Sequence, residues 1–228
     1  MELSPRLKKI AELIPVGSTL ADIGTDHAYI PVYCQQNGIT TSCLAMDVNK
    51  GPLDRANANI NKYGFEDKIK TRLSNGLSNL KPGEADVIVI AGMGGLLIED
   101  IIRNGTDAIG DETLLLLQPM IAPIELRSYL YSSGFNITDE YVVREENKFY
   151  NIFAVKKGSF KPSEFDLYFG KNIAKNSPDT IIAYLEYKIR VCKNIIFGMK
   201  KAENPDCDTI RTYENELGIY QSVLKELK

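Results

Sequence analysis

The residues with the clearest chemical potential follow the first predicted strand, in the segment "DIGTDHAYIP" from Asp22 to Pro31. It begins like a nucleotide-binding turn, with an apolar strand, an acid and Gly24. Asp26 then stands where a dinucleotide-binding loop has its second glycine. Because that glycine lets the backbone approach a pyrophosphate, a carboxylate in its place would repel the phosphates. The loop therefore predicts a ligand that carries positive charge and no phosphate.

S-adenosylmethionine fits this loop and the polar residues that end the next two predicted strands. Its sulfonium and α-ammonium groups suit carboxylates, and Asp47 ends the second strand, where an acid can accept hydrogen bonds from ribose hydroxyls. Asn75-Gly76 ends the third strand, where an amide could bind an adenine edge, although each of these residues alone could equally cap a loop or form a turn. We expect the cofactor to contact Asp22, Gly24, Thr25, Asp26, Asp47, Val48, Asn75, Gly76, Ala91 and Gly92.

The loop after the fourth predicted strand, "IAGMGG" from Ile90 to Gly95, is where the methyl acceptor should arrive. Its three glycines would let the backbone approach a flat ring, and Met93 would form an apolar wall. The alternative is a tight turn into a helix. The segment Gln118–Met120 after the fifth strand either lines the same mouth or merely ends that strand.

Strands and helices alternate up to about residue 157, which predicts an open, doubly wound, Rossmann-like α/β sheet. The apolar runs 86–92 and 113–119 suit strands buried on both faces of a parallel sheet. No helix separates the strands near 141–144 and 150–156, so we expect an antiparallel hairpin at one end of the mostly parallel sheet. The other predicted strands are 20–23, 42–47 and 69–74, and the predicted helices are 29–37, 51–64, 95–103 and 123–133.

After Gly158 a polar connector leads to two heptad series, which predict a C-terminal antiparallel helical hairpin, or coiled coil. Apolar residues repeat at steps of three and four: Ile182, Leu185, Ile189, Cys192, Ile196 and Met199, then Ile210, Tyr213, Leu217, Tyr220, Leu224 and Leu227. "ENPDCD" separates the series, with Pro205 as helix breaker and Asp208 as candidate N-cap. We therefore divide the chain into a cofactor-binding domain, residues 1–157, and a helical hairpin domain, residues 158–228.

Composition and charge bear on three questions: whether the protein binds nucleic acid, holds a metal or enters a membrane. The net charge of −3 gives no global positive charge that would indicate nucleic acid. The four cysteines form no C-x-x-C pair and the chain has one histidine, so we expect reduced thiols, no metal and a cytoplasmic protein. The N-terminal segment lacks the apolar core of a signal peptide, and the longest aliphatic run, 114–117, is too short for a bilayer, so we expect no membrane partner. We expect a monomer or a weak dimer.

The segments "DIGTDHAYIP", "AMDVN", "SNGL", "IAGMGG" and "LQPM", followed by a helical hairpin, resemble in this order the bacterial tRNA (adenine-22-N1)-methyltransferase family of the TrmK type. The resemblance spans essentially the whole chain, with Asn75 as a departure, because the family often has Asp there. It implies a class I S-adenosylmethionine-dependent enzyme that methylates N1 of adenine 22 in tRNA. The alternatives are a methyltransferase of a small molecule or protein, with the hairpin as an oligomerisation element, and a non-catalytic binding module of the same fold.

The implied reaction assigns roles to further residues. N1 of adenine has a free lone pair, so transfer needs alignment and tolerance of the product's positive charge rather than a general base. Asp26 is the first candidate for electrostatic help, and His27, Tyr29 and Met93 complete the expected reaction site, although a lone histidine in a turn more often positions its neighbours. Two basic segments could contact RNA, or could be solvated helix faces: Arg6, Lys8, Lys9, Lys188, Arg190 and Lys193.

Overall fold

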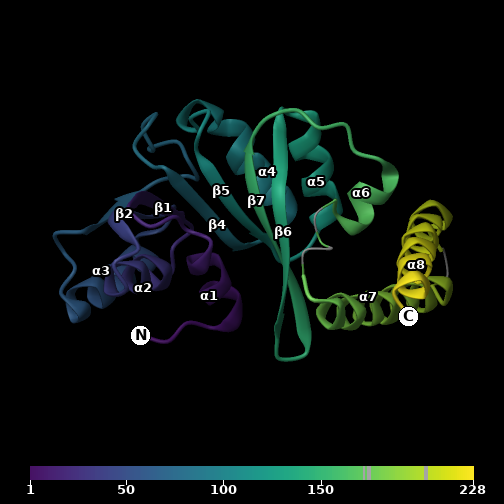
Figure 1. The fold of residues 1–228 in the computed structure, drawn as a ribbon. Helices are drawn as coiled ribbons and strands as arrows, with labels where there is room; N and C mark the ends of the chain where they lie inside the picture. Colours follow the sequence, from purple (N-terminus) through teal and green to yellow (C-terminus); the bar gives the residue numbers. More distant parts are fainter. Residues whose placement is uncertain (172, 174–175, 203–204) are drawn as a thin grey trace.

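Seven strands form one sheet in the computed structural model, which describes residues 1–171, 173, 176–202 and 205–228 (Figure 1). The strand order is β3-β2-β1-β4-β5-β7-β6. The strands are β1 (Ser18–Ile23), β2 (Thr40–Asp47), β3 (Ile69–Leu73), β4 (Val87–Met93), β5 (Leu114–Pro119), β6 (Phe135–Glu145) and β7 (Lys148–Lys157). The helices are α1 (Pro5–Glu12), α2 (Tyr29–Gln36), α3 (Lys50–Tyr63), α4 (Gly95–Asn104), α5 (Pro123–Ser132), α6 (Glu164–Phe169), α7 (Pro178–Lys200) and α8 (Cys207–Leu227), with a short 3-10 turn at Thr106–Ala108.

The first five strands run parallel, and the chain changes its direction of progress across the sheet between β3 and β4. It moves outward from β1 through β2 to β3, then returns to place β4 on the other side of β1. In a doubly wound sheet such a switch point leaves a crevice at the carboxyl ends of the two central strands. The loops that follow β1 and β4 therefore border one crevice, and the predicted fold class is confirmed.

Alternate residues of the central strands pack on opposite faces of the sheet. Ile88 and Ile90 of β4 belong to the core that also contains apolar residues of α4 and α5. Val87 and Val89 belong to the core that contains apolar residues of α1, α2 and α3. All four side chains are almost fully buried. A strand covered on both faces has no polar side, which explains the continuous apolar runs in the sequence.

The predicted antiparallel hairpin exists and is longer than predicted. β6 and β7 pair from Phe135 to Glu145, and β7 lies between β5 and β6 rather than at the sheet edge. The hairpin projects beyond the other strands, between α1 and α7 (Figure 1). The prediction missed the first half of β6 because polar residues such as Asp139 and Glu140 interrupt its apolar pattern.

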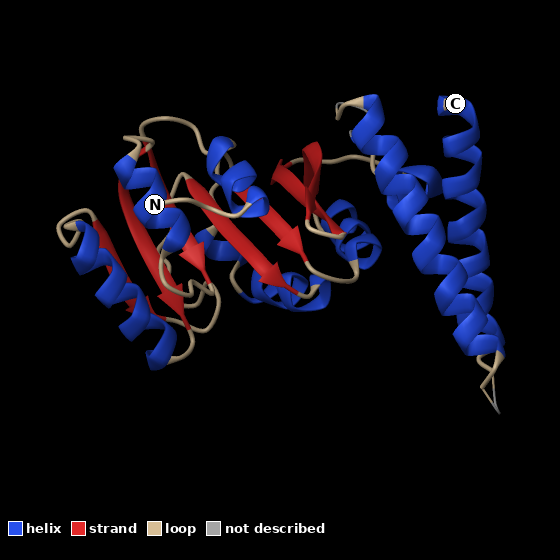
Figure 2. Ribbon diagram, turned by 90° about the horizontal axis from the view of Figure 1, so that it is seen from below, coloured by secondary structure: helices blue, strands red, loops and turns tan. Residues whose placement is uncertain are grey.

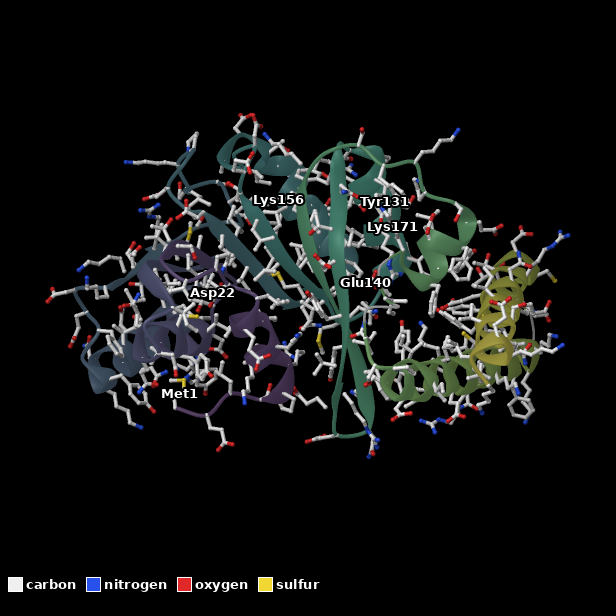
Figure 3. The ribbon with its side chains drawn as sticks, viewed as in Figure 1. Met1, Asp22, Tyr131, Glu140, Lys156 and Lys171 are labelled. Carbon is white, nitrogen blue, oxygen red and sulfur yellow. The ribbon has the colours of Figure 1, made fainter. Side chains whose placement is uncertain are left out.

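A buried polar network fastens the C-terminal helices to the sheet. Arg127 of α5 forms an ion pair with Glu140 of β6, and their side chains are 1% and 0% exposed. Figure 3 labels Glu140 on its strand. Asn151 of β7 donates to Glu140 at 3.1 Å and accepts a hydrogen bond from the Tyr184 hydroxyl of α7 at 3.2 Å. A Cβ on Gly170 would collide with the Glu140 carboxylate, so only glycine fits there. Because a buried charge without its partner is costly, this network fixes α7 against the sheet.

The helices α7 and α8 lie side by side as the predicted hairpin, although their buried positions differ from the heptad series (Figure 2). Ile181 and Tyr184 of α7 are buried with Val142 of β6, whereas Leu227 of α8 is 41% exposed. α7 therefore has two buried faces, one against α8 and one against the sheet, and a single heptad seam predicts only one. The domain boundary at residue 157 stays a prediction.

The connections around the hairpin also differ in detail from the sequence analysis. The N-cap of α8 is Asp206, whose side chain accepts the Thr209 N–H at 3.1 Å, so Asp208 lies in the first turn instead. The polar connector contains α6, and its residues 172 and 174–175 lie outside the described residues, as do 203–204 of the "ENPDCD" segment. In the described part of the chain, no helix combines the length and the apolar character that crossing a membrane requires.

Candidate functional site

A pocket of about 300 Å³ opens at the switch point, between the loops that follow β1 and β4. Arg6 and Leu7 of α1 and Ile30 of α2 complete its walls. The predicted site residues that line it are Asp22, Gly24, Thr25, Asp26, Tyr29, Ala91 and Gly92. The structure thus brings the first and fourth predicted loops together, because the carboxyl ends of parallel strands meet at one edge of the sheet.

Asp22 is the buried carboxylate of this pocket (Figure 3). The residue is 7% exposed, and its Oδ2 accepts a hydrogen bond from the Thr25 hydroxyl at 2.7 Å. Burial raises the pKa of Asp22 from 3.8 to about 6; the Thr25 bond lowers it and the charge of Asp47 raises it. A cation beside Asp22 would favour the ionised form, so this carboxylate suits a positively charged ligand.

The loop after β1 is fixed by the end of β2 and by Met93. The N–H groups of Gly24 and Thr25 both donate to the Met46 carbonyl, at 2.8 and 2.9 Å. Gly24 has a φ of +74°, and a Cβ there would collide with Cε of Met93, so the position requires glycine. Met93, predicted at the reaction, packs over this glycine and is not among the residues that line the pocket.

Asp26 presents an exposed carboxylate that already has a cationic partner. Its side chain is 57% exposed, and its Oδ1 lies 2.8 Å from Nη2 of Arg55 on α3 and 3.6 Å from Nε2 of His27. Arg55 was not predicted as a site residue, because no local motif marks a residue that α3 brings to the loop. Arg55 offsets part of the Asp26 charge, so electrostatic help from Asp26 stays a prediction.

His27 and Ala28 hold a backbone conformation that residues other than glycine rarely adopt, with φ of 66° and 50°. Each such residue costs on the order of 1–3 kcal/mol and persists only where its surroundings hold it. Here Nδ2 of Asn59 donates to the His27 carbonyl at 2.7 Å. The His27 ring stacks on Tyr29, with ring centroids 5.1 Å apart. The strained turn therefore presents a stacked pair beside the pocket, which favours positioning over direct chemistry for His27.

Arg6 enters the pocket from α1, which the sequence analysis did not predict. Its Nη1 donates to Oε1 of Gln118 at 2.6 Å, and the same oxygen accepts the Gly92 N–H at 3.1 Å. Gln118 is fully buried near the end of β5. Arg6 was predicted to contact RNA. For Gln118 the sequence left two interpretations open, a residue that lines the site and a residue that merely ends the strand. The hydrogen bond between Arg6 and Gln118 depends on where α1 packs, which the spacing of residues in the sequence does not predict.

The residues predicted for the ribose and adenine lie along the same sheet edge but outside this pocket. Asp47 ends β2, where its Oδ1 accepts the Asn49 N–H at 2.7 Å, and Val48 is 57% exposed. Asn75 and Gly76 line a separate hollow of about 200 Å³ beside α4. The pocket, Asp47 and this hollow therefore follow the ends of β1, β2 and β3 in order, as an extended nucleoside ligand would require.

Lys8 and Lys9 line a groove of about 670 Å³ between α1, β6 and α7. The ammonium of Lys9 lies 4.4 Å from the ring centroid of Tyr141, and Arg144 adds a third cation. Glu12 and Asp179 also line the groove, so its charge is mixed, and three cations against two carboxylates leave it positive.

Lys188 does not lie on the exposed basic face predicted for α7. Its side chain is 18% exposed, and its Nζ lies 3.1 Å from Oε1 of Glu216 on α8. A buried carboxylate on the facing helix holds this ammonium within the hairpin, and contact of Lys188 with RNA stays a prediction. Arg190 and Lys193 are exposed, and their contact with RNA stays a prediction.

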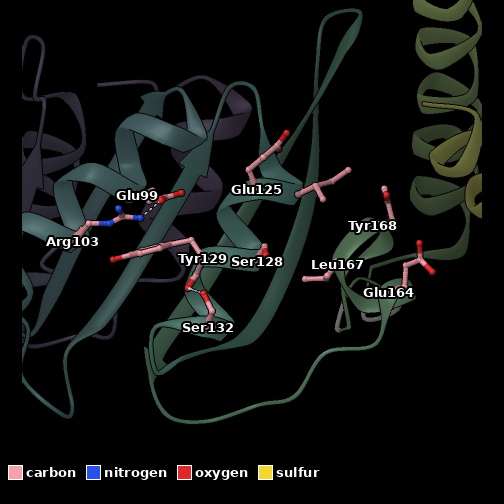
Figure 4. Close-up of a pocket in the computed structure, with 10 residues that line it drawn as sticks. Glu99, Arg103, Glu125, Ser128, Tyr129, Ser132, Glu164, Leu167 and Tyr168 are labelled. Atoms are coloured by element: carbon pink, nitrogen blue, oxygen red, sulfur yellow. Dashed lines mark hydrogen bonds and ion pairs between the residues drawn. The ribbon is translucent and has the colours of Figure 1, made fainter. Parts of the chain in front are cut away.

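A further hollow of about 590 Å³ lies between α4, α5 and α6 (Figure 4). Glu99, Glu125 and Glu164 line it together with Arg103, which pairs with Glu99. None of the predicted site residues lines it. Although it is larger, the candidate site is the pocket at the switch point, where the predicted residues meet.

Known proteins resemble the chain both in sequence and in fold. The profile of a family described as "Methyltransferase domain" matches residues 3–153. The tRNA (adenine(22)-N(1))-methyltransferase of Bacillus subtilis (strain 168) is 39% identical over 158 residues, which cover 69% of this chain and 66% of that protein. A Streptococcus pneumoniae protein crystallised with S-adenosyl-L-methionine is similar with a TM-score of 0.86 at 31% identity, over 98% of this chain and 100% of that chain. M. capricolum TrmK in complex with S-adenosyl-homocysteine gives a TM-score of 0.81 at 29% identity, over 100% of both chains.

Proposed function

Because the chain belongs to the tRNA (adenine(22)-N1)-methyltransferase family of the TrmK type, we propose that it transfers a methyl group from S-adenosylmethionine to N1 of adenine 22 in tRNA. The observation that carries this proposal is the pocket at the switch point. Its carboxylates, Asp22 and Asp26, suit a cationic ligand and oppose a pyrophosphate. Asp26, which excludes a dinucleotide on sequence grounds, therefore lines the same pocket as the buried carboxylate of Asp22.

The residues along this sheet edge fit S-adenosylmethionine by their chemistry. In the described part of the chain no cation pairs with the buried carboxylate of Asp22. The ammonium group of the cofactor would supply that missing positive charge. Asp47 would accept the ribose hydroxyls, and Asn75 would meet the adenine edge, with Gly76 leaving room for the ring. When bound, the cofactor supplies an electrophilic methyl group on a positively charged sulfur.

The chain's own residues have to receive the adenine and tolerate its charge after methylation. N1 lies on the Watson–Crick edge, so the base must leave its stack, which costs a few kcal/mol. Tyr29 is 41% exposed and lines the pocket, so its ring can support the incoming base. The backbone of Ala91 and Gly92 borders the same space. Asp26 supplies negative charge near the product cation, moderated by Arg55.

The groove between α1, β6 and α7 is the proposed path of the tRNA backbone. Lys8, Lys9 and Arg144 line this groove, while Arg6 of the same helix lines the pocket. α1 therefore forms a wall of both, so phosphates that contact the groove would lie next to the site of transfer. Arg190 and Lys193, which are exposed farther along α7, are further candidates for phosphate contact.

The direct test is to map the methylated position on a tRNA transcript after incubation with the protein and S-adenosylmethionine. Primer extension should stop at adenine 22, because N1-methylation blocks base pairing there. A transcript with guanine at position 22 is the matched control and should give no stop. A full stop at another adenine, or methylation of metabolites or protein but not of the transcript, would refute the proposed substrate.

A further inference from the structure

Three exposed apolar side chains form a rim beside the candidate pocket. They are Leu96 at the start of α4, and Met120 and Ile121 in the loop after β5; Ile121 is 70% exposed. The pocket lies at the ends of β1 and β4, and β5 is the other neighbour of β4 in the sheet. The apolar rim therefore borders the pocket on the side away from β1.

Hydrogen bonds join the apolar rim to the wall of the pocket. Gln118 accepts the Gly92 N–H at 3.1 Å and donates to Sδ of Met120 at 3.5 Å. Gly92 lines the pocket where the methyl acceptor should arrive. The Met120 N–H also donates to the Met93 carbonyl at the end of β4, at 2.7 Å. The apolar rim is thus part of the mouth through which the adenine would enter.

The backbone that carries Ile121 is fixed, although the side chain is exposed. The Ile121 carbonyl accepts the Gly95 N–H at 2.9 Å, and a Cβ on Gly95 would collide with the Ala122 carbonyl. Ala122 has a φ of +56°, a left-handed conformation that persists only where its surroundings hold it. A β-branched side chain also has few rotamers. Ile121 therefore loses little conformational freedom when a partner covers it.

The chain around the apolar rim has no charged residue. Segments 91–98 and 118–124 contain no Asp, Glu, Lys or Arg, although these residues make up 25% of the chain. A phosphate would find no cation in these segments, whereas Lys8 and Lys9 offer cations in the groove beside α1. The face of a nucleobase is flat and uncharged, so aliphatic side chains can pack on it. The apolar rim suits bases rather than the RNA backbone.

We propose that Ile121 fills the gap that adenine 22 leaves in the RNA stack when it enters the pocket, while Leu96 and Met120 pack on the neighbouring base. This inference rests on the proposed function and deepens it. Extruding a base costs its stacking energy, and some nucleic-acid-binding proteins insert apolar side chains between unstacked bases. Ile121 is a positioning residue, because it would contact the RNA beside the adenine and not the reacting atoms.

The cofactor and a second copy of the chain are the other candidates to cover the apolar rim. Leu97, the next exposed leucine, lines the hollow beside Asn75 and Gly76 and so belongs to the proposed adenine site of the cofactor. No residue of the apolar rim lines that hollow or the pocket. The RNA is favoured over a second copy, because the tRNA has to occupy this mouth for transfer to occur.

The test measures extrusion of the base and transfer of the methyl group separately. A tRNA with 2-aminopurine, a fluorescent adenine analogue, at position 22 should brighten when the wild type and S-adenosylhomocysteine bind, because the base leaves its stack. With Ile121→Ala the rise should be smaller. On an ordinary transcript the single-turnover rate should fall about 10-fold, the effect of losing about two buried methylene groups. The affinity for S-adenosylhomocysteine should stay unchanged.

Matched variants separate a wedge from a general effect of substitution. Ile121→Leu should keep nearly the wild-type rate, because it restores the apolar volume. Ile121→Asn is similar in size but polar, and should lose at least as much rate as Ile121→Ala. Val16→Ala is the control: this exposed aliphatic residue precedes β1, at the opposite edge of the sheet, and its loss should change neither emission nor rate. Thermal unfolding should confirm that all variants are folded.

Three outcomes overturn the inference while the wild type still methylates adenine 22. The first is an unchanged emission rise and an unchanged rate in Ile121→Ala. The second is weaker binding of S-adenosylhomocysteine by Ile121→Ala, which would assign the apolar rim to the cofactor. The third is a wild-type dimer that Ile121→Ala dissociates, which would assign the rim to a second copy. If primer extension showed no methylation at adenine 22 by the wild type, the proposed function itself would fail, and this inference with it.

Discussion

Replacing Asp22 by Asn should stabilise the cofactor-free protein at neutral pH and weaken its binding of the cofactor. Burial raises the pKa of Asp22 from 3.8 to about 6, so the ionised carboxylate is disfavoured in the folded state. A shift of about 2 pKa units corresponds to about 3 kcal/mol. Asn keeps an oxygen for the Thr25 hydroxyl and carries no charge, so the variant avoids this cost.

The sign of the pH dependence follows from proton binding. Because the pKa is raised, the folded state binds more protons than the unfolded state between about pH 4 and pH 6. The contribution of Asp22 to the free energy of unfolding is therefore fully favourable below about pH 4 and is lost as the pH rises through about 6. Asp22→Asn should exceed the wild type by up to about 3 kcal/mol at pH 8, and the two should converge near pH 4.

Urea unfolding of the cofactor-free protein from pH 4 to pH 8 measures this difference, and calorimetry with S-adenosylhomocysteine measures binding. The exposed Asp54 of α3 provides the matched control, because Asp54→Asn should not open a pH-dependent gap from the wild type. Parallel stability curves for the wild type and Asp22→Asn over this range would refute the electrostatic argument. Undiminished affinity in Asp22→Asn would refute the role of Asp22 in cation binding.

The other variants probe the reaction, the ribose and the RNA surface. Asp26→Ala should lower the single-turnover rate of methyl transfer more than the affinity for tRNA, and His27→Ala should have a milder effect; unchanged rates with both substrates saturating would contradict the role of Asp26. Asp47→Ala should weaken S-adenosylhomocysteine by about 1–3 kcal/mol in calorimetry, because the ribose loses a charged acceptor, and near-wild-type affinity would move the ribose elsewhere. Lys188→Ala should lower the free energy of unfolding by about 1–3 kcal/mol, since its buried partner on α8 loses a cation. Lys193→Ala should instead leave stability unchanged. It should reduce the salt dependence of tRNA binding by ~0.9 log units of slope, for one lost phosphate contact. The reverse pattern in urea unfolding and filter binding would restore Lys188 to the RNA surface.

The sequence by itself determined the elements of the sheet and the residues at their ends. Apolar runs such as 113–119 report burial on both faces, and Gly64 ends α3 in the left-handed conformation expected of a C-terminal glycine. The order of strands and loops then placed Asp22, Asp26 and Gly92 at one edge, because parallel strands share the edge at which they end. These are local or topological properties, so the linear pattern contains them.

Only the tertiary structure decided which side chains from different helices and strands form ion pairs and hydrogen bonds with one another. Arg55 reaches Asp26, Arg6 reaches Gln118, and Lys188 pairs with Glu216 inside the hairpin. The physical reason is that periodicity reports how deeply a face is buried and says nothing of which charge lies on the neighbouring element. A lysine in a basic run and a lysine paired with a buried carboxylate look alike in a sequence, and only the packing of α7 on α8 distinguishes them.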